Sequence, residues 1–347
     1  MGWFTIRNYG FSDATEIFVF ISGYSATLAY GMGRAPFDFL FTSARILRRC
    51  WQLYAAHILL FVIFAAYVAS VSAGPGNPMF AEEMNVTRFL RNPETTLIQV
   101  LLLRFRPVNM DVLPLYIVLM LTFPLMLPVL RRRPWAGLGL SAALWLAARA
   151  FDLNLRTYPN GGVWYFDPFA WQFLFVIGSF AALRPEVPSW FLARAKYLDI
   201  PVAAFLLFSL FVVLGWKFPV LEHRLPRAVE GWMYPIDKTA LDPLRLVHFL
   251  CLAYAAARRI GPESPIVGFR AFRPLEVCGR HSLEIFCLGT ILSLIAIISV
   301  DRTNGSLAFH LAVAMMGIAV MTGAAFCLDW YQRRARESAA TRMKGNV

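Results

Sequence analysis

The stretch RNYGFSDATEIFVFISGY at residues 7–24 decides the fold class, because it places carboxylates directly before an apolar run of membrane-spanning length. Asp13 and Glu16 have the spacing of a capping box, in which each side chain bonds the backbone N–H of the other. About 20 apolar residues in a helix cross the hydrocarbon of a bilayer. We therefore predict a transmembrane helix over residues 14–33, with two carboxylates at its N-terminal end.

The whole chain shares this apolar character. Of its 347 residues, 58% are hydrophobic and only 16% are charged, with a mean hydropathy of +0.56, which is too apolar for one soluble core. Long unbroken apolar runs exclude a transmembrane β-barrel, because each barrel strand would show about ten residues that alternate between apolar and polar. The prediction is an all-α, polytopic membrane helix bundle forming a single domain over residues 1–347. Nine transmembrane helices are expected, near residues 14–33, 50–72, 111–130, 134–151, 168–184, 198–216, 241–258, 281–299 and 306–330.

The charge distribution predicts the orientation of these helices. Most of the 33 lysines and arginines lie in the segments 34–49, 131–133, 184–196, 258–280 and 333–347. By the positive-inside rule these segments face the cytoplasm, so we expect a bacterial inner-membrane protein with a cytoplasmic C-terminus. The net charge of +12 then reflects topology and contact with the lipid bilayer, and nothing in it indicates nucleic-acid binding.

Nine helices with a cytoplasmic C-terminus leave the N-terminus outside. Residues 1–13 contain no apolar core or cleavage site of a signal peptide that would explain this. One further helix before residue 1 would put both termini inside, so we expect that a first helix is missing. The five cysteines are too scattered for a metal site, and no metal is expected.

Acidic residues precede several of the predicted spans on the outer side. Asp167 and Asp242 each come directly before a proline, which is typical of an N-cap followed by proline at the first helical position. Capping alone is a sufficient explanation for each carboxylate. However, several acids that converge at one end of a bundle also suit a site for sugar hydroxyls, since polar groups in membrane helices are often functional.

Two histidines lie within predicted spans. His248 follows Asp242 and Arg245 at three-residue intervals, so the three side chains share about 120° of one helix face and can line one cavity. His57 lies inside the second span. Either histidine could act as a general base, or each could simply bond a neighbouring helix.

Basic residues on the inner side form a second candidate site. Arg34, Arg45, Arg48 and Arg49 could hold the phosphates of a cytoplasmic donor, because guanidinium groups match phosphate geometry. The positive-inside rule predicts the same cluster without any such role. The chain contains no nucleophile elbow, P-loop, zinc-protease motif or dinucleotide fingerprint.

Several longer blocks together resemble the OpgC family over essentially the whole chain from residue 3 onward. The blocks are WFTIRNYGFSDATEIFVFISGY (3–24), WQLYAAHILLF (51–61), RPVNMDVLPLYIVLM (106–120), WYFDPFAWQFLFVIG (164–178), DKTALDPLRLVHFLCLAY (237–254) and GRHSLEIFCLGTILS (279–293). The resemblance implies a ten-helix inner-membrane O-succinyltransferase, similar to the membrane acyltransferase-3 group. Its donor would be cytoplasmic succinyl-CoA, a co-substrate rather than a bound cofactor, and its acceptor a periplasmic glucan.

The resemblance also implies roles for individual residues. Asp13 and Glu16 would stand at the acceptor mouth, and a base would activate a glucose hydroxyl while Arg245 or Lys238 stabilises the oxyanion. Relatives carry a first helix ending near a histidine usually suspected as the base, and the present sequence has neither. His248 and His57 are the remaining candidates for the base, with Asp13 as an orienting partner. Aromatic faces for sugar rings would come from Trp164, Trp171 and Trp232, although a position at the membrane interface explains these tryptophans equally well.

Two other functions remain open. A transporter or flippase of polar glycans would need alternating access, and the lack of an internal repeat weighs against it. An inactive remnant is the third possibility, because we expect that the helix carrying the base is missing, either through a start assigned too late or through loss of the helix.

Overall fold

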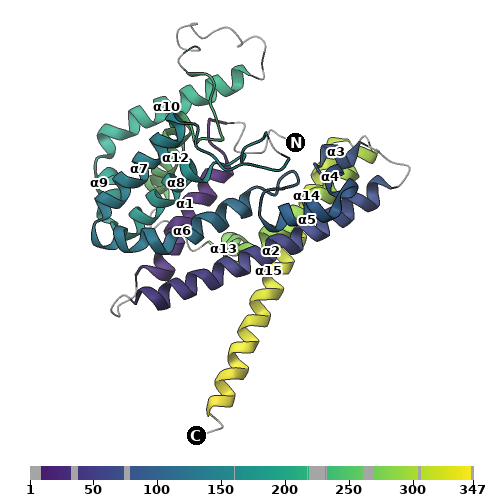
Figure 1. Ribbon diagram of the computed structural model, residues 1–347. Helices are drawn as coiled ribbons and strands as arrows, with labels where there is room; N and C mark the ends of the chain where they lie inside the picture. Colours follow the sequence, from purple (N-terminus) through teal and green to yellow (C-terminus); the bar gives the residue numbers. More distant parts are fainter. Residues whose placement is uncertain are drawn as a thin grey trace. The chain divides into compact units, whose positions relative to one another are not determined.

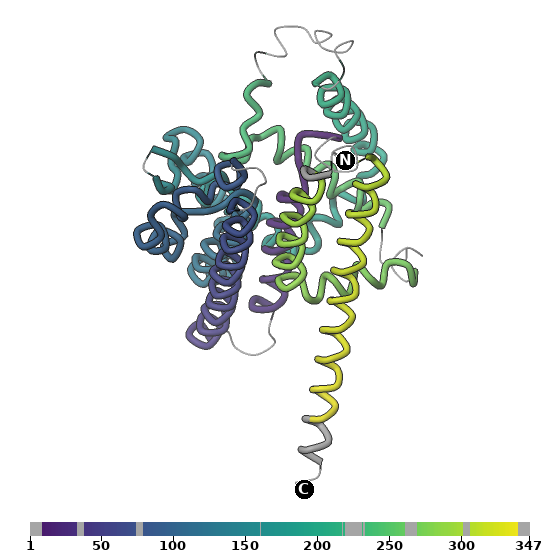
Figure 2. Tube along the Cα trace, turned by 90° about the vertical axis from the view of Figure 1, so that its right-hand side faces the viewer, coloured from purple at the N-terminus to yellow at the C-terminus, as the bar shows by residue number. Residues whose placement is uncertain are grey.

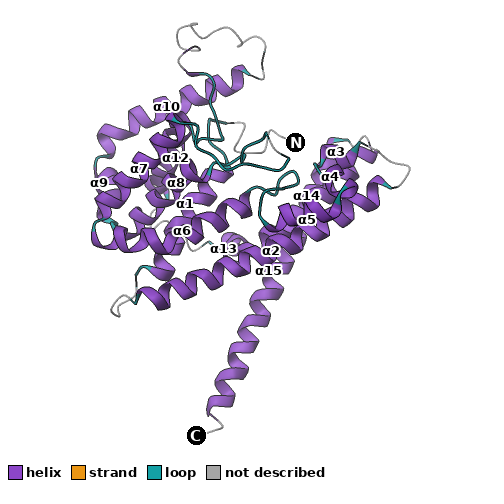
Figure 3. Cartoon of the chain, viewed as in Figure 1, coloured by secondary structure: helices purple, strands orange, loops and turns teal. Residues whose placement is uncertain are grey.

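Helices make up the regular structure of the chain, with no strand among the residues that the structure describes (Figure 3). The computed structural model describes residues 9–344 apart from 33–37, 74–78, 160, 217, 219–230, 232, 261–268 and 304–305. These residues form two compact units. The larger unit comprises Gly2–Ala55 and Thr87–Arg259, and the smaller comprises Ala56–Val86 and Ile260–Val347. The prediction of a single domain stays a prediction.

The larger unit holds most of the helices (Figure 1). In chain order they are α1 (Ala14–Tyr30), the first half of α2 (Phe39–Ser72), α4 (Thr87–Arg91), α5 (Pro93–Leu101), α6 (Val112–Arg132), α7 (Pro134–Ala150), α8 (Pro168–Leu183), α9 (Glu186–Ala193), α10 (Ala195–Gly215) and α12 (Pro243–Arg259). The smaller unit holds the second half of α2, α3 (Phe80–Glu83), η3 (Arg270–Phe272), α13 (Arg273–Arg280), α14 (Ser282–Thr303) and α15 (Leu307–Lys344). The long α15 packs on α13 and α14 and runs on as one straight helix toward the C-terminus (Figure 2).

Each of the nine predicted spans coincides with one described helix, and five of these helices are long and apolar enough to cross a membrane. Those five are α2, α6, α10, α14 and α15. The others, α1, α7, α8 and α12, have 16 or 17 residues. At 1.5 Å per residue such a helix is about 25 Å long, slightly short of a hydrocarbon core of about 30 Å. The chain is therefore a multi-pass membrane protein, and the count of nine spans stays a prediction.

Helix α8 forms the centre of the larger unit. It packs against α1, α6 and α7, and most of its residues are buried, including Trp171 and Phe175. A helix surrounded in this way is apolar on all sides, as its sequence PFAWQFLFVIGSFAAL shows. Gln172 and Ser179 are the exceptions, and the Gln172 side chain joins α8 to α7 through the hydroxyl and carbonyl of Ser141 at 2.5 and 2.9 Å.

Two glycines let α1 and α8 approach closely. A Cβ atom on Gly23 would lie 1.9 Å from the carbonyl oxygen of Phe175, and one on Gly178 would lie 2.1 Å from that of Phe20. The Ser179 hydroxyl donates to the Gly23 carbonyl at 3.1 Å across the same contact. Small residues at helix crossings are typical of membrane bundles, where close backbone packing drives association. This contact sets the position of α1, whose N-terminal end carries the candidate site.

Candidate active site

The N-terminal end of α1 has the capping box that the sequence predicts. The Asp13 carboxylate accepts a hydrogen bond from the Thr15 N–H at 2.9 Å, and Glu16 accepts one from the Asp13 N–H at 2.8 Å. These bonds satisfy backbone donors that a helix leaves free in its first turn. They also hold both carboxylates in fixed positions beside α12.

Two cations from distant parts of the sequence neutralise this pair of acids. The Lys238 Nζ atom lies 2.5 Å from Asp13 Oδ2, and Arg245 on α12 lies 2.6 Å from Glu16 Oε1 and 3.4 Å from Asp13 Oδ2. We call Asp13, Glu16, Lys238 and Arg245 the charge quartet. The structure thus brings together four of the predicted site residues.

Burial makes the balance of charge in the quartet important. The Glu16 side chain is fully buried and those of Asp13 and Arg245 are nearly so. Burial would raise the pKa of Asp13, but hydrogen bonds from Lys238 and the Thr15 N–H outweigh it and hold that pKa well below its ordinary value. An unpaired charge here would be costly, so the two acids and two cations stabilise one another.

A rigid turn presents Lys238 to the quartet. The Asp237 carboxylate accepts hydrogen bonds from the N–H groups of Thr239 and Ala240 at 2.8 and 3.0 Å. Trp171 Nε1 donates to the carbonyls of Lys238 and Thr239 at 3.1 and 3.0 Å. The predicted substrate-binding residue Trp171 is therefore fully buried and supports the turn through its ring nitrogen. Its contact with a substrate stays a prediction.

The other two predicted caps are also present. Asp242 accepts from the Leu244 N–H at 2.8 Å at the start of α12, and its second oxygen accepts from Arg149 of α7 at 3.2 Å. Asp167 accepts from the Phe169 N–H at 2.9 Å at the start of α8, while its own N–H donates to the Thr239 carbonyl at 3.0 Å. The same two aspartates thus cap helices, and both fasten the turn that carries Lys238, since the Asp242 N–H donates to the Asp237 carbonyl at 3.0 Å.

Asp167 also has an unusual protonation behaviour. Burial raises its pKa to about 6, with the N–H groups of Phe169 and Ala170 acting in the opposite direction. The buried Oδ2 atom has no hydrogen-bond partner within the described part of the chain. Asp167 therefore gains or loses a proton near neutral pH.

His248 lies on α12 one turn beyond Arg245 and is buried next to Ser12. Its Nδ1 atom is 2.7 Å from the Ser12 hydroxyl oxygen and accepts a hydrogen bond from the Ser12 N–H at 3.2 Å. The imidazole also packs against the ring of Phe11, with 5.8 Å between centroids. Beside the ring, a Cβ atom on Gly10 would lie 2.0 Å from Nε2, so any larger residue there would displace the imidazole. The histidine proposed as a base is thus held firmly at the same end of the bundle as the quartet.

Trp164 is buried beneath an arginine. The guanidinium carbon of Arg106 lies 4.2 Å from the centre of the Trp164 ring, and Arg106 Nε lies 3.2 Å from Asp111 Oδ1. A cation over an indole ring in this way is favourable. The ring face of Trp164 is therefore in contact with Arg106, and its role as a platform for a sugar stays a prediction.

The remaining predicted site residues lie elsewhere. His57 is buried on α2 within the smaller unit. Among the predicted donor-site arginines, Arg45 lies over the rings of Tyr30 and Phe41 at 5.3 and 6.0 Å, and Arg49 donates to Gln52 at 3.3 Å. Arg48 is exposed on the same helix, and Arg34 lies outside the described residues, as does Trp232.

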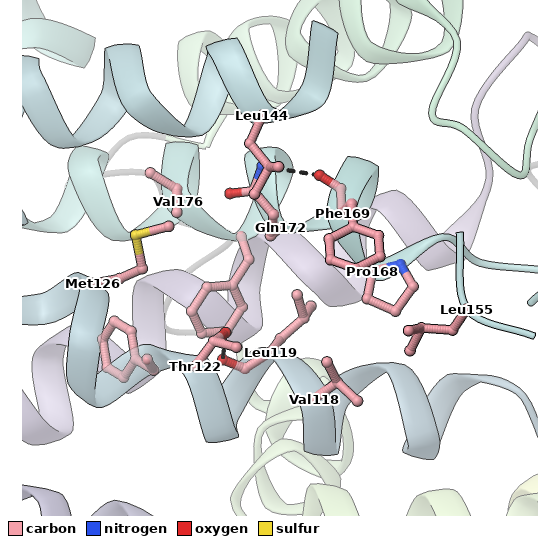
Figure 4. A pocket seen from close by; sticks show the side chains of 12 residues that line it. Val118, Leu119, Thr122, Met126, Leu144, Leu155, Pro168, Phe169, Gln172 and Val176 are labelled. Carbon is pink, nitrogen blue, oxygen red and sulfur yellow. Dashed lines mark hydrogen bonds between the residues drawn. The ribbon is translucent and has the colours of Figure 1, made fainter. Parts of the chain in front are cut away.

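An apolar pocket of about 210 Å³ lies between α6, α7 and α8 (Figure 4). Its lining includes Leu119, Phe123 and Val176, and its polar side chains are Thr122 and Gln172. Both have partners already, since Thr122 donates to the Leu119 carbonyl and Gln172 is bonded to Ser141 and Phe169. The pocket has no charged residue in its lining and is distinct in chemistry from the charge quartet.

Sequence reasoning missed two residues that complete the site. Ser12 carries no motif, and only the folded arrangement shows its contact with His248, which is 236 positions away. Arg149 was part of a predicted span, where a single arginine in the last turn was a usable signal because charges in spans are paired.

Comparison with known proteins supports the resemblance seen in the sequence. A family model described as OpgC protein matches residues 1–333 of the chain, which confirms that expectation. No curated protein and no solved structure matches the chain.

Proposed function

Because the chain belongs to the OpgC family, we propose that it is an O-succinyltransferase of the bacterial inner membrane that acts on periplasmic glucans. The family implies a membrane acyltransferase-like role in glucan modification. The proposal adds the succinyl group, the donor succinyl-CoA on the cytoplasmic side, and the glucan hydroxyl as acceptor on the periplasmic side.

One observation carries this proposal: a buried histidine and a balanced group of charges share one end of α1 and α12. Transfer of an acyl group needs a base, which the imidazole of His248 supplies at Nδ1. It also needs positive charge near the oxygen that becomes anionic, and Lys238 and Arg245 are the nearby cations. The acids of the quartet hold these cations in place and accept hydrogen bonds from sugar hydroxyls.

The arginines at the start of α2 supply the donor side in this proposal. Arg45, Arg48 and Arg49 follow one another at helical spacing on α2, and Arg48 is exposed. Guanidinium groups bind phosphate through paired hydrogen bonds, which suits the phosphates of coenzyme A. Replacing Arg48 with Gln should raise the KM for succinyl-CoA with a smaller change in kcat.

The test uses the purified full-length chain in lipid nanodiscs with radiolabelled succinyl-CoA and unsubstituted glucan. We expect label on the glucan, and a loss of about 100-fold or more in His248→Ala, since a general base contributes about 10²–10⁴-fold. His310→Ala is the matched control, because His310 lies on α15 and bonds the carbonyl of Ser306 in its own segment. Unlabelled glucan with the wild-type chain, or transfer by His248→Ala at the wild-type rate, would contradict the proposal.

A further inference from the structure

The contact between Ser12 and His248 determines which nitrogen of the imidazole is basic. The Ser12 backbone N–H donates to His248 Nδ1 at 3.2 Å. A backbone N–H only donates, so Nδ1 is the unprotonated acceptor and neutral His248 carries its proton on Nε2. The Ser12 hydroxyl, 2.7 Å from the same atom, then donates to Nδ1 as well.

This geometry restricts what His248 does as a base. Its basic atom faces the Ser12 hydroxyl, and both residues are buried, at 1% and 2% exposure. The ring cannot swing away easily, because Phe11 packs on it at 5.8 Å and Gly10 leaves no free space beside Nε2. A sugar hydroxyl would have to displace Ser12 to reach Nδ1. The hydroxyl already in place is that of the serine.

We infer that Ser12 is a nucleophile that carries the acyl group between donor and acceptor, an inference that rests on the proposed transferase function. In the first step the Ser12 oxygen attacks the thioester carbonyl of the donor. The oxygen–carbon bond forms, the carbon–sulfur bond breaks, and the serine proton passes through His248 Nδ1 to the leaving thiolate. In the second step the oxygen of an acceptor hydroxyl bonds to the acyl carbon, and the bond between that carbon and the Ser12 oxygen breaks. The acceptor proton passes through His248 Nδ1 to the Ser12 oxygen, which regenerates the serine.

The surroundings of Ser12 suit such an intermediate. Ser12 is joined directly to Asp13, whose carboxylate holds Lys238 at 2.5 Å and Arg245 at 3.4 Å, so the residue next to the serine binds the two cations that could stabilise an oxyanion. Burial at 1% exposure keeps bulk water from the ester, which favours transfer over hydrolysis. A serine activated by an adjacent imidazole is a recurring arrangement in acyl transfer.

The experiment separates the two steps. The full-length chain in nanodiscs is incubated with radiolabelled succinyl-CoA in the absence of glucan, and the labelled peptide is identified by mass spectrometry. We expect label on the peptide that contains Ser12, and its release when glucan is added. Ser12→Ala should lose the label and at least about 100-fold in transfer rate. Ser12→Cys should still be labelled, now as a thioester that neutral hydroxylamine cleaves.

Ser209→Ala is the matched control, because Ser209 is a fully buried serine of α10 whose hydroxyl donates to the Leu206 carbonyl. It should keep both label and transfer. Transfer to glucan by the wild type without any labelled Ser12 peptide, together with transfer by Ser12→Ala at the wild-type rate, would overturn the inference and leave the proposed function standing. A wild-type chain that neither becomes labelled nor modifies glucan would overturn both.

Discussion

Arg245 holds Glu16 through two of its nitrogen atoms. Its Nε donates to Glu16 Oε1 at 2.8 Å, and Nη2 lies 2.6 Å from the same oxygen. The glutamate side chain is fully buried, so this contact is the means by which its charge is tolerated inside the bundle. It also links α1, whose N-cap Asp13 directly follows Ser12, to α12, which carries His248.

Replacing Arg245 with Met should destabilise the protein strongly. The change leaves the Glu16 charge buried without its main partner, and removing one member of a buried pair costs about 3–5 kcal/mol. Thermal unfolding in detergent measures the effect. The double variant Glu16→Leu/Arg245→Met should regain much of that stability but no transferase activity. A double variant as unstable as the single one would show that the ion pair is not the cause.

Gly178→Ala should weaken the packing of α1 on α8. The added methyl group would lie 2.1 Å from the carbonyl oxygen of Phe20, a backbone atom that cannot rotate away. Overpacking of this kind costs about 1–3 kcal/mol. Gly139→Ala on α7 is the control, because a Cβ atom there meets nothing within 4 Å. Equal melting temperatures for the two variants would contradict the close contact.

Asp167 should make stability depend on pH near neutrality. Its pKa in the folded protein is raised to about 6 from an ordinary value of 3.8. A carboxyl group whose pKa is raised on folding stabilises the folded state fully at pH values below its ordinary pKa of 3.8. This stabilisation is lost as the pH rises through about 6. The wild type should therefore lose stability between pH 4 and 7 relative to Asp167→Asn.

The asparagine variant keeps the helix cap, because its amide oxygen accepts the bond from the Phe169 N–H as the carboxylate does. Melting temperatures of both proteins across this pH range give the comparison. Parallel curves would show that Asp167 does not titrate in this window.

Trp171→Phe should loosen the turn that carries Lys238. It removes the N–H that bonds the Lys238 and Thr239 carbonyls, at a cost of about 1 kcal/mol, while keeping most of the apolar contact. We expect a lower transfer rate from a less ordered Lys238. Trp135→Phe serves as the control, since Trp135 is an exposed residue of α7 whose ring packs on Phe180. Equal transfer rates for Trp171→Phe and Trp135→Phe would contradict the proposal that the turn positions Lys238.

The sequence was a good guide to local structure. The capping box at Asp13, the prolines after Asp167 and Asp242, and the apolar run of each helix are local signals, and the structure has each of them. Local signals suffice there because caps and helix periodicity involve residues a few positions apart.

The site itself needed the folded chain. Asp242, Arg245 and His248 share a helix face by spacing alone, but their partners come from three other helices or loops. Glu16 lies 229 positions from Arg245, and Ser12 lies 236 positions from His248. No periodicity in one sequence encodes such pairings, because they depend on which helices pack together.

The glycine contact between α1 and α8 has a consequence for the rigidity of the site. The backbones of α1 and α8 are in contact at Gly23 and Gly178, so one helix cannot shift along the other without a steric clash. These two helices therefore form a rigid side of the site. By contrast, α10 buries only Ser209, Val212 and Val213 among its described residues, and it packs on α12. Helix α10, whose Phe205 and Phe208 pack on Phe11 beside Ser12, is therefore the less firmly packed side of the site.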